Sequence, residues 1–369
     1  MIKGCRIWVI GIILFIFIII LLIFLPTYTD ETVETVDLSE LREAARIYLH
    51  YPRTVEDSAG KKITVYTPVR RVIVLNTDCA EAVRILGSGE KIVGVAEGIT
   101  TKKGYYFPEL SATPSVGKWN QPDIETIASL DPDLVIAYVR WPGSELDLDL
   151  EAFKIPVLRL DFTNQENLEE EVWKLGHLLD KEGEERAEAY IEWYTGYEEA
   201  VKNFVETHDR RPKVFLEQSK GVEDLSEIGT YSNGSASDTL CTLAGGINIA
   251  HNLTTAYPHV EAEWVLDKEP DIVIKHRYVS WGWKNSTEPQ EIRDELMNRP
   301  GWRSIIGEEN VRVTSCETLY GLDSVVGLIQ WTKLFYPDFN IDSEAVYREY
   351  LEMQGIRYPE GMVFIYPEI

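Results

Sequence analysis

The sequence predicts an α/β fold with two similar lobes, each built on a mainly parallel β-sheet. One long α-helix joins the lobes, and an N-terminal transmembrane anchor precedes them. Short β-branched runs alternate with helical stretches, which is typical of a parallel sheet covered on both faces. Residues 184–206 carry apolar side chains at uninterrupted helical spacing. In addition, a motif of the first half recurs in the second half, 138 residues later.

The anchor is predicted from the first 25 residues. Lys3 and Arg6 precede residues 7–25, which are all apolar except for one glycine. At a rise of about 1.5 Å per residue, such a helix nearly matches the roughly 30 Å of bilayer hydrocarbon. A cleaved signal peptide is the alternative, but residues 24–27 offer no A-x-A cleavage pattern. We expect an uncleaved, single-pass anchor in the cell membrane, with the basic end inside and the remaining chain extracytoplasmic.

Residues 26–53 are acidic and poor in large apolar clusters, so they predict a tether. The first lobe is expected over residues 54–182 and opens with a β-hairpin that turns at residues 57–60. Its strands are predicted at residues 72–75, 92–95, 134–136 and 157–160, with helices at 79–86 and 124–130.

A single bridging helix is predicted over residues 183–208, and it would reach roughly 35 Å or more. The second lobe is expected over residues 209–369, where the β/α alternation resumes after Pro212. Its strands are predicted at residues 214–216, 272–274 and 311–313, and a helix is predicted at 324–334.

The recurring motif is E-x-[IV]-x4-P-D-[LI]-V-I, which begins at Glu125 and again at Glu263. In each half a strand begins about fifty residues before the glutamate. Chance is the alternative, since proline ends helices and aspartate suits turns in many α/β folds. The preferred interpretation is a duplicated architecture in which each lobe presents one glutamate at the same place.

Residues that leave the strands are candidates for ligand binding, because ligands of open α/β sheets collect beyond the carboxyl ends of the strands. Rings and guanidinium groups in these loops suit a bulky, partly conjugated or anionic ligand. Packing in the core is the alternative for any single ring, and capping of the next helix is the alternative for Asp78. The predicted ligand-binding residues are Asn76, Trp119, Tyr138, Arg140, Tyr231, Tyr257, His276, Arg277 and Tyr320.

Charge and motifs exclude several classes of function. With 36 Lys+Arg against 61 Asp+Glu, the net charge of −25 would repel a nucleic acid. The sequence has no H-E-x-x-H, G-x-S-x-G or phosphate-loop pattern, and its four cysteines form no C-x-x-C pair. We therefore expect no enzyme, no cofactor and no metal centre, and the pairing of Cys79, Cys241 and Cys316 stays open.

Taken together, the motifs resemble the substrate-binding proteins of iron–siderophore and cobalamin ABC importers. The similarity covers about residues 55–339, and no single piece of it is specific. It is carried by residues 55–65, 71–76, 91–95, 107–110, 115–119, both copies of the motif, 320–322 and 334–338. It implies two Rossmann-like lobes, bridged by one rigid helix, with the ligand in the cleft between them.

The resemblance also implies that Glu125 and Glu263 dock onto the two permease subunits of an ABC importer. Favourable placement in the first turn of a helix is the simpler explanation of both acids, and the two explanations are compatible. We expect capture of a chelated metal, a ferric–siderophore complex first and cobalamin or haem as the alternative. An extracellular sensor is a further alternative, although only residues 1–6 would remain inside, and a surface hydrolase would need a nucleophile that the sequence does not show.

Overall fold

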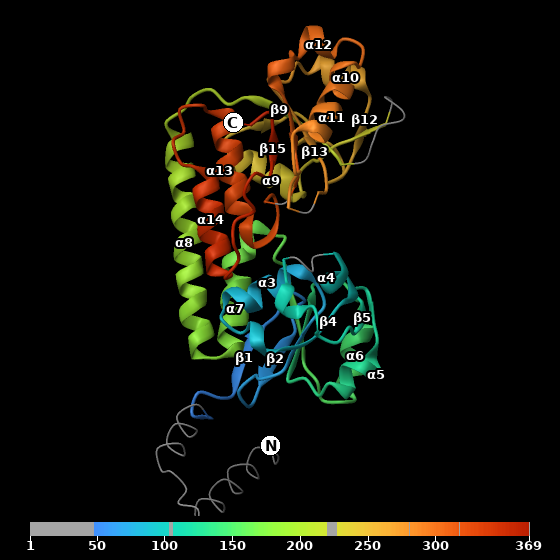
Figure 1. The fold of residues 1–369 in the computed structure, drawn as a ribbon, viewed down its shortest axis with the longest axis vertical. Coiled ribbons are helices and arrows are strands. Elements are labelled where there is room, and N and C mark those ends of the chain that lie inside the picture. Colours follow the sequence, from blue (N-terminus) through green and yellow to red (C-terminus); the bar gives the residue numbers. More distant parts are fainter. Residues whose placement is uncertain (1–47, 103–105, 220–226, 280, 317, 369) are drawn as a thin grey trace, which may run out of the picture. The chain divides into compact units, whose positions relative to one another are not determined.

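Two β-sheets built from short, buried runs of β-branched residues form the framework of the protein (Figure 1). The computed structural model describes residues 48–102, 106–219, 227–279, 281–316 and 318–368. Both sheets belong to the compact unit that begins at His50. The predicted two-lobed α/β fold with parallel sheets is therefore confirmed.

The sheet of the first lobe has the strand order β4-β3-β7-β8, and all of its pairs are parallel. Alternate side chains face opposite layers, as the period of two in a strand requires. Val72 and Val74 pack in the core that contains α3 and α7, whereas Ile73 packs in the core that contains α5 and α6. The elements are β3 (Val72–Val74), α3 (Thr77–Ile85), β4 (Ile92–Val95), α4 (Glu97–Lys102), α5 (Ile124–Ser129), β7 (Leu134–Tyr138), α6 (Glu145–Glu151), β8 (Val157–Leu160) and α7 (Leu168–Leu179).

Two small ribbons accompany this sheet. The predicted hairpin is confirmed as β1 (Arg53–Glu56) paired antiparallel with β2 (Lys62–Val65). A second pair, β5 (Gly117–Lys118) and β6 (Gln121–Pro122), precedes α5.

The sheet of the second lobe has the order β11-β9-β13-β14-β15, and it is parallel except for β15. Phe215 and Val273 pack with α10, α11 and α12, whereas Val214 and Ile274 pack in the core that contains α9 and α13. The elements are β9 (Lys213–Glu217), β10 (Ile228–Gly229), α9 (Ala236–Leu243), β11 (Ile247–Asn248), β12 (His259–Val260), α10 (Ala262–Asp267), β13 (Ile272–His276), α11 (Thr287–Met297), α12 (Trp302–Ile305), β14 (Val311–Thr314), α13 (Ser324–Phe335), α14 (Ser343–Met353) and β15 (Ile365–Tyr366).

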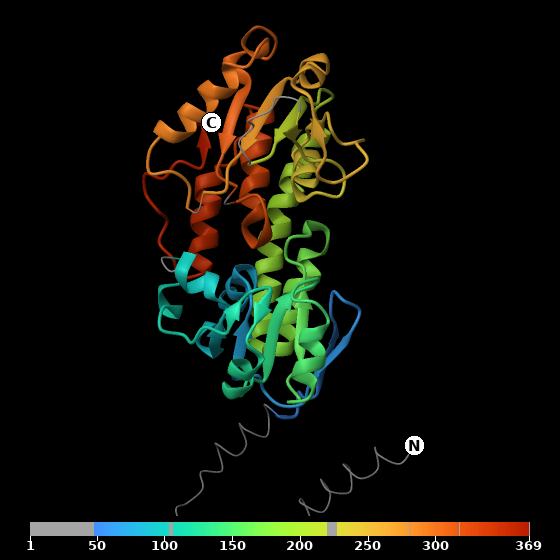
Figure 2. The ribbon, with the colours of Figure 1, turned by 90° about the vertical axis from the view of Figure 1, so that its right-hand side faces the viewer.

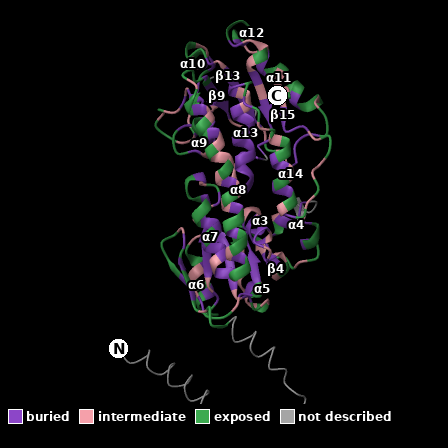
Figure 3. Cartoon of the chain, turned by 90° about the vertical axis from the view of Figure 1, so that its left-hand side faces the viewer, coloured by how far each residue is buried: buried purple, intermediate pink, exposed green. Residues whose placement is uncertain are grey.

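The bridging helix is α8 (Lys181–Glu206), which passes alongside both lobes (Figures 1 and 2). Its 26 residues reach about 39 Å at the usual rise. It begins two residues before the predicted position because Asp180 is the N-cap, accepting a 2.8 Å hydrogen bond from the N–H of Gly183. Buried and exposed residues alternate along it (Figure 3), as expected for a helix with one face on the core.

Tyrosines attach α8 to the helices of the second lobe. The hydroxyl of Tyr190 donates to the carbonyl of Leu322 at 2.6 Å, and the hydroxyl of Tyr194 lies 3.0 Å from that of Ser324. The C-terminal helix α14 adds a direct link to the first lobe, because Tyr350 donates to the buried carboxylate of Glu81 at 2.8 Å. The lobes are therefore joined by hydrogen bonds as well as by the chain itself.

The repeated motif forms the same local structure twice. Asp131 and Glu269, which precede the two prolines, both adopt left-handed backbone conformations, with φ of 46° and 48°. In each copy the aspartate after the proline accepts from the N–H that opens the neighbouring strand, Arg71 at 2.9 Å and Lys213 at 2.8 Å.

The side chains of the same two basic residues also cap the C-terminal ends of the helices α5 and α10. The guanidinium of Arg71 donates to the carbonyl of Leu130 at 2.6 Å, and the ammonium of Lys213 donates to that of Lys268 at 3.2 Å. These carbonyls belong to the C-cap residues of α5 and α10. A shared strand–helix–turn geometry at this level of detail supports duplication over chance.

No helix within the described residues is long and apolar enough to cross a membrane. The predicted anchor at residues 7–25 lies outside those residues, as does the predicted tether up to residue 47. Cys79, Cys241 and Cys316 are buried, and Cys79 and Cys241 are free thiols.

Glu198 on α8 is a half-buried acid that the packing of the helix perturbs. Burial, and then the neighbouring carboxylate of Glu169 on α7, raise its pKa to about 7. A glutamate in an unfolded chain titrates near pH 4.3. The folded state therefore binds more protons than the unfolded state between about pH 4.5 and 7, and stability falls as the pH rises through that window.

Replacing Glu198→Gln removes this ionisation, so we expect the variant to be more stable than the wild type at pH 8. The gain should be about 1–2 kcal/mol after allowance for solvent screening, it should be much smaller at pH 5, and it should vanish below about pH 4. Urea unfolding at both pH values measures it, with the exposed neighbour Glu199→Gln as control. An equal gain at pH 5 and pH 8 would contradict the assignment.

Candidate functional site

A cleft of about 840 Å³ lies where the carboxyl ends of strands from both sheets meet. The first lobe contributes the residues that follow β3, β7 and β8, and the second contributes the start of α9 and the loops after β13 and β14. Parallel strands bring their loops to one edge of a sheet, so the topology itself assembles this site.

Five of the predicted ligand-binding residues line the cleft. Tyr138 and Arg140 come from the first lobe, and Tyr231, Tyr257 and Tyr320 come from the second. The rings of Tyr231 and Tyr257 meet edge to face with centroids 6.0 Å apart. The structure therefore brings together aromatic residues that lie up to 182 positions apart in the chain.

Two other predicted residues serve the framework of the site and are not among the described residues that line it. Asn76 is the N-cap of α3, and its side-chain oxygen accepts from the N–H of Cys79 at 2.8 Å. Trp119 is exposed and packs edge to face against the ring of Tyr138, with centroids 6.0 Å apart.

His276 and Arg277 also lie away from the described lining, because β13 extends two residues beyond the predicted end of this strand. His276 is fully buried behind Tyr231, and burial, with a smaller effect of Lys275, lowers its pKa to about 3, so the ring is neutral. The guanidinium of Arg277 donates to the carbonyl of Ser219 at 3.1 Å.

Sequence reasoning missed several residues that line the cleft: Asp161, Thr163, Asn164, Gln165, Glu166, Tyr278 and Cys316. The loop 161–166 directly follows β8, so the rule of strand ends, applied to that strand as well, would have found it. Asp78, for which capping of the next helix was the alternative to ligand contact, lines the cleft and accepts a 2.8 Å hydrogen bond from the hydroxyl of Tyr138, whereas the N-cap of α3 is Asn76.

The cleft carries more negative than positive charge. Among the described lining residues, the carboxylates are Asp78, Asp161 and Glu166, whereas Arg140 is the one guanidinium. Burial raises the pKa of Tyr138, with a further contribution from Asp78, and burial likewise raises the pKa of Tyr231 and of Tyr320. These phenols are therefore neutral hydrogen-bonding groups at physiological pH.

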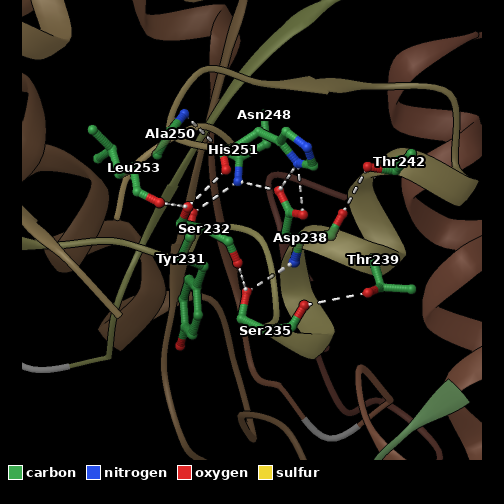
Figure 4. A network of polar contacts seen from close by, with 10 residues as sticks. All are labelled: Tyr231, Ser232, Ser235, Asp238, Thr239, Thr242, Asn248, Ala250, His251 and Leu253. Atoms are coloured by element: carbon green, nitrogen blue, oxygen red, sulfur yellow. Dashed lines mark hydrogen bonds and ion pairs between the residues drawn. The ribbon is translucent and has the colours of Figure 1, made fainter. Parts of the chain in front are cut away.

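Tyr231 is held in place by a polar network at the start of α9 (Figure 4). The side-chain amide of Asn248 donates to the carbonyl of Tyr231 at 2.8 Å and to the buried carboxylate of Asp238 at 2.7 Å. The Nδ1 of His251 lies 2.9 Å from the other oxygen of Asp238. One buried carboxylate thus organises the backbone that carries a cleft tyrosine.

Two matching lobes, a connecting helix and a cleft between strand ends define a substrate-binding protein of the ABC-importer type. The chain belongs to the periplasmic binding protein family, whose model matches residues 72–317. Members of this family are extracytoplasmic substrate-binding transport proteins rather than enzymes.

Relatives and a solved structure agree with this assignment. The chain is 25% identical to a vitamin B12-binding protein of Vibrio parahaemolyticus over 68% of this chain and 89% of that protein. It is 26% identical to a cobalamin-binding protein of Halobacterium salinarum over 61% of this chain and 58% of that protein. The TroA-like periplasmic binding protein FepB of Veillonella parvula has a TM-score of 0.73 at 19% identity, covering 86% of this chain and all of that one, which shows the shared fold.

Replacing Asp238→Ala should destabilise the second lobe by roughly 2 kcal/mol or more, because the buried amide of Asn248 and the ring of His251 lose their acceptor. Chemical unfolding measures the loss. The matched control is Asp267→Ala at the exposed end of α10, which should change stability little. Equal effects of the two substitutions would show that the network contributes nothing.

Proposed function

We propose that the protein captures a bulky metal chelate without net negative charge, a cobalamin-type corrinoid first, and delivers it to the permease of an ABC importer. One observation carries the choice of ligand: neutral phenols and an excess of carboxylates line the cleft. The names of the vitamin B12-binding and cobalamin-binding relatives support the same choice.

The charge of the cleft argues against an anionic chelate, and for this reason we put a corrinoid ahead of the ferric–siderophore complex that the sequence put first. An anionic ligand would need the two predicted cations, Arg140 and Arg277, to face it together. Only Arg140 lines the cleft, and the guanidinium of Arg277 is directed to Ser219 and lies 3.8 Å from the carboxylate of Glu288. Like charges of ligand and site repel, so an anionic chelate is disfavoured.

Aromatic rings in the cleft favour a ligand with extended flat or apolar surface. Tyr231 is almost fully buried, Tyr138 and Tyr320 are partly buried, and Tyr257 and Tyr278 are exposed at the rim. Each ring offers an apolar face together with a hydroxyl, which suits a metal macrocycle with polar groups on its periphery.

Delivery to the permease is proposed to use Glu125 and Glu263. Each is exposed and is the second residue of a six-residue helix, α5 in the first lobe and α10 in the second (Figure 1). The shared Pro-Asp turn fixes each helix to its own sheet, so the two carboxylates are presented in equivalent ways. Two separated negative groups orient and steer a protein onto a cationic partner.

The proposal also includes a single-pass membrane anchor at residues 7–25 with the lobes on the extracytoplasmic side. It is supported by the apolar run and by the basic residues that precede it. Such an anchor would keep the protein near the permease and raise their effective concentration.

A panel of four chelates tests the choice of ligand: cyanocobalamin, the cationic ferrioxamine B, an anionic ferric tricatecholate and haemin. We expect cyanocobalamin to raise the melting temperature and to bind measurably in titration calorimetry, since a ligand that binds only the folded state stabilises it by mass action. Ferrioxamine B tests whether the absence of negative charge on a chelate is enough for binding without a corrin ring. Preferential binding of the tricatecholate or of haemin would refute the proposal that the ligand carries no net negative charge.

Replacing both Glu125→Ala and Glu263→Ala should leave ligand affinity unchanged and reduce uptake of the ligand by cells at least tenfold. The reason is that the substitutions remove contacts with the permease without touching the cleft. The control is a double variant of exposed acids on other helices, Glu151→Ala with Glu295→Ala. Normal uptake by the first double variant would exclude the docking role.

A further inference from the structure

Gln165 is a cleft residue whose side chain has unusual surroundings. It opens the short 3-10 helix η3 (Gln165–Asn167) directly after β8, and it is among the residues that line the cleft. The residue is 92% buried, its exposed fraction being 8%. Neither its amide oxygen nor its amide nitrogen has a hydrogen-bond partner within the described residues.

The backbone around Gln165 is firmly held. The hydroxyl of Thr163 donates to the carboxylate of Asp161 at 2.6 Å, and the side-chain oxygen of Asn164 accepts from the N–H of Glu166 at 3.2 Å. The N–H of Asp161 donates in turn to the buried carboxylate of Glu171 at 3.0 Å. The loop therefore fixes the position of Gln165, and the side-chain torsions are its remaining freedom.

Other buried glutamines of this protein are bonded. The amide oxygen of Gln354 accepts from Arg84 at 2.8 Å and its nitrogen donates to Tyr106 at 2.9 Å, while the oxygen of Gln330 accepts from Thr318 at 3.3 Å. Leaving a buried polar group unpaired costs about 1–3 kcal/mol, and such groups are rare in native structures. An amide that is unpaired on both sides at a binding cleft therefore points to a ligand.

We propose that Gln165 is a specificity-determining residue that recognises an uncharged amide group on the periphery of the chelate. A carboxamide carries one donor and one acceptor, which are complementary to the donor and the acceptor of the glutamine side chain. The side chain turns toward the cleft as the ligand binds. Because both of its atoms are already shielded from water, each new hydrogen bond forms with little further desolvation of the protein.

Two neighbouring carboxylates strengthen the preference for an uncharged ligand. Asp161 and Glu166 line the same part of the cleft and accept further N–H groups, but they repel a ligand that carries carboxylates at that position. Corrinoids carry primary carboxamides around the ring, and ferrioxamine B carries amide links between its iron-binding groups, whereas haemin carries carboxylates. The inference rests on the proposed function, since it concerns the ligand of the same cleft.

The test compares the full-length wild type with Gln165→Met, which keeps the size of the side chain and removes both polar atoms. We expect roughly a ten- to hundredfold loss of affinity for cyanocobalamin, or for ferrioxamine B if that is the chelate bound, with an unchanged or higher melting temperature. Gln330→Met is the matched control, because it alters a buried glutamine away from the cleft. It should lower the melting temperature and leave affinity unchanged.

Unchanged affinity of Gln165→Met would overturn this inference and leave the proposed function intact. A loss of affinity together with a melting temperature as low as that of Gln330→Met would assign a structural role to Gln165 and would also overturn it. Failure of the wild type to bind either amide-bearing chelate, or binding of haemin alone, would refute the proposed function and the inference together.

Discussion

Hydrogen bonds from buried tyrosines tie the two lobes to a common set of helices, and the cleft depends on this constraint. Tyr190 and Tyr194 fasten α8 to the segment that begins α13, and Tyr350 of α14 reaches the first lobe at Glu81. Each phenol is buried, so water cannot replace these hydrogen bonds without opening the core. The two groups of strand ends are thereby held at a fixed separation, and the loops between them are presented as one site.

The fold could be predicted from local patterns of apolar residues in the sequence. Val72 to Val74 and Ile272 to Ile274 are buried on both faces, and this requires the continuous apolar runs from which their strands were predicted. The bridging helix was recognised from its apolar spacing, and its start was misplaced by two residues because the cap is a single aspartate. The duplicated motif was visible in sequence because proline and aspartate occupy a turn that both lobes need.

The residues of the site were harder to predict from the sequence than the fold. Strand ends indicated Tyr138 and Tyr320, but the length of β13 decided whether His276 would face the cleft or the core, and apolar patterning does not set that boundary to within two residues. Arg277 is engaged by Ser219, a residue of another strand end, through a contact that only the folded chain reveals. The strand-end rule would have indicated the loop that contains Gln165. However, the property that distinguishes Gln165 within this loop, a buried amide without a hydrogen-bond partner among the described residues, is visible only in the folded chain.

The cysteines have a practical consequence. Burial raises the pKa of Cys79 and of Cys241 well above the ordinary value, so both thiols stay protonated and shielded from reagents. A maleimide dye will therefore react with a cysteine introduced on the exposed surface of either lobe in preference to Cys79 and Cys241. The fold thus lends itself to fluorescence measurements of whether the distance between the lobes stays constant when the ligand binds.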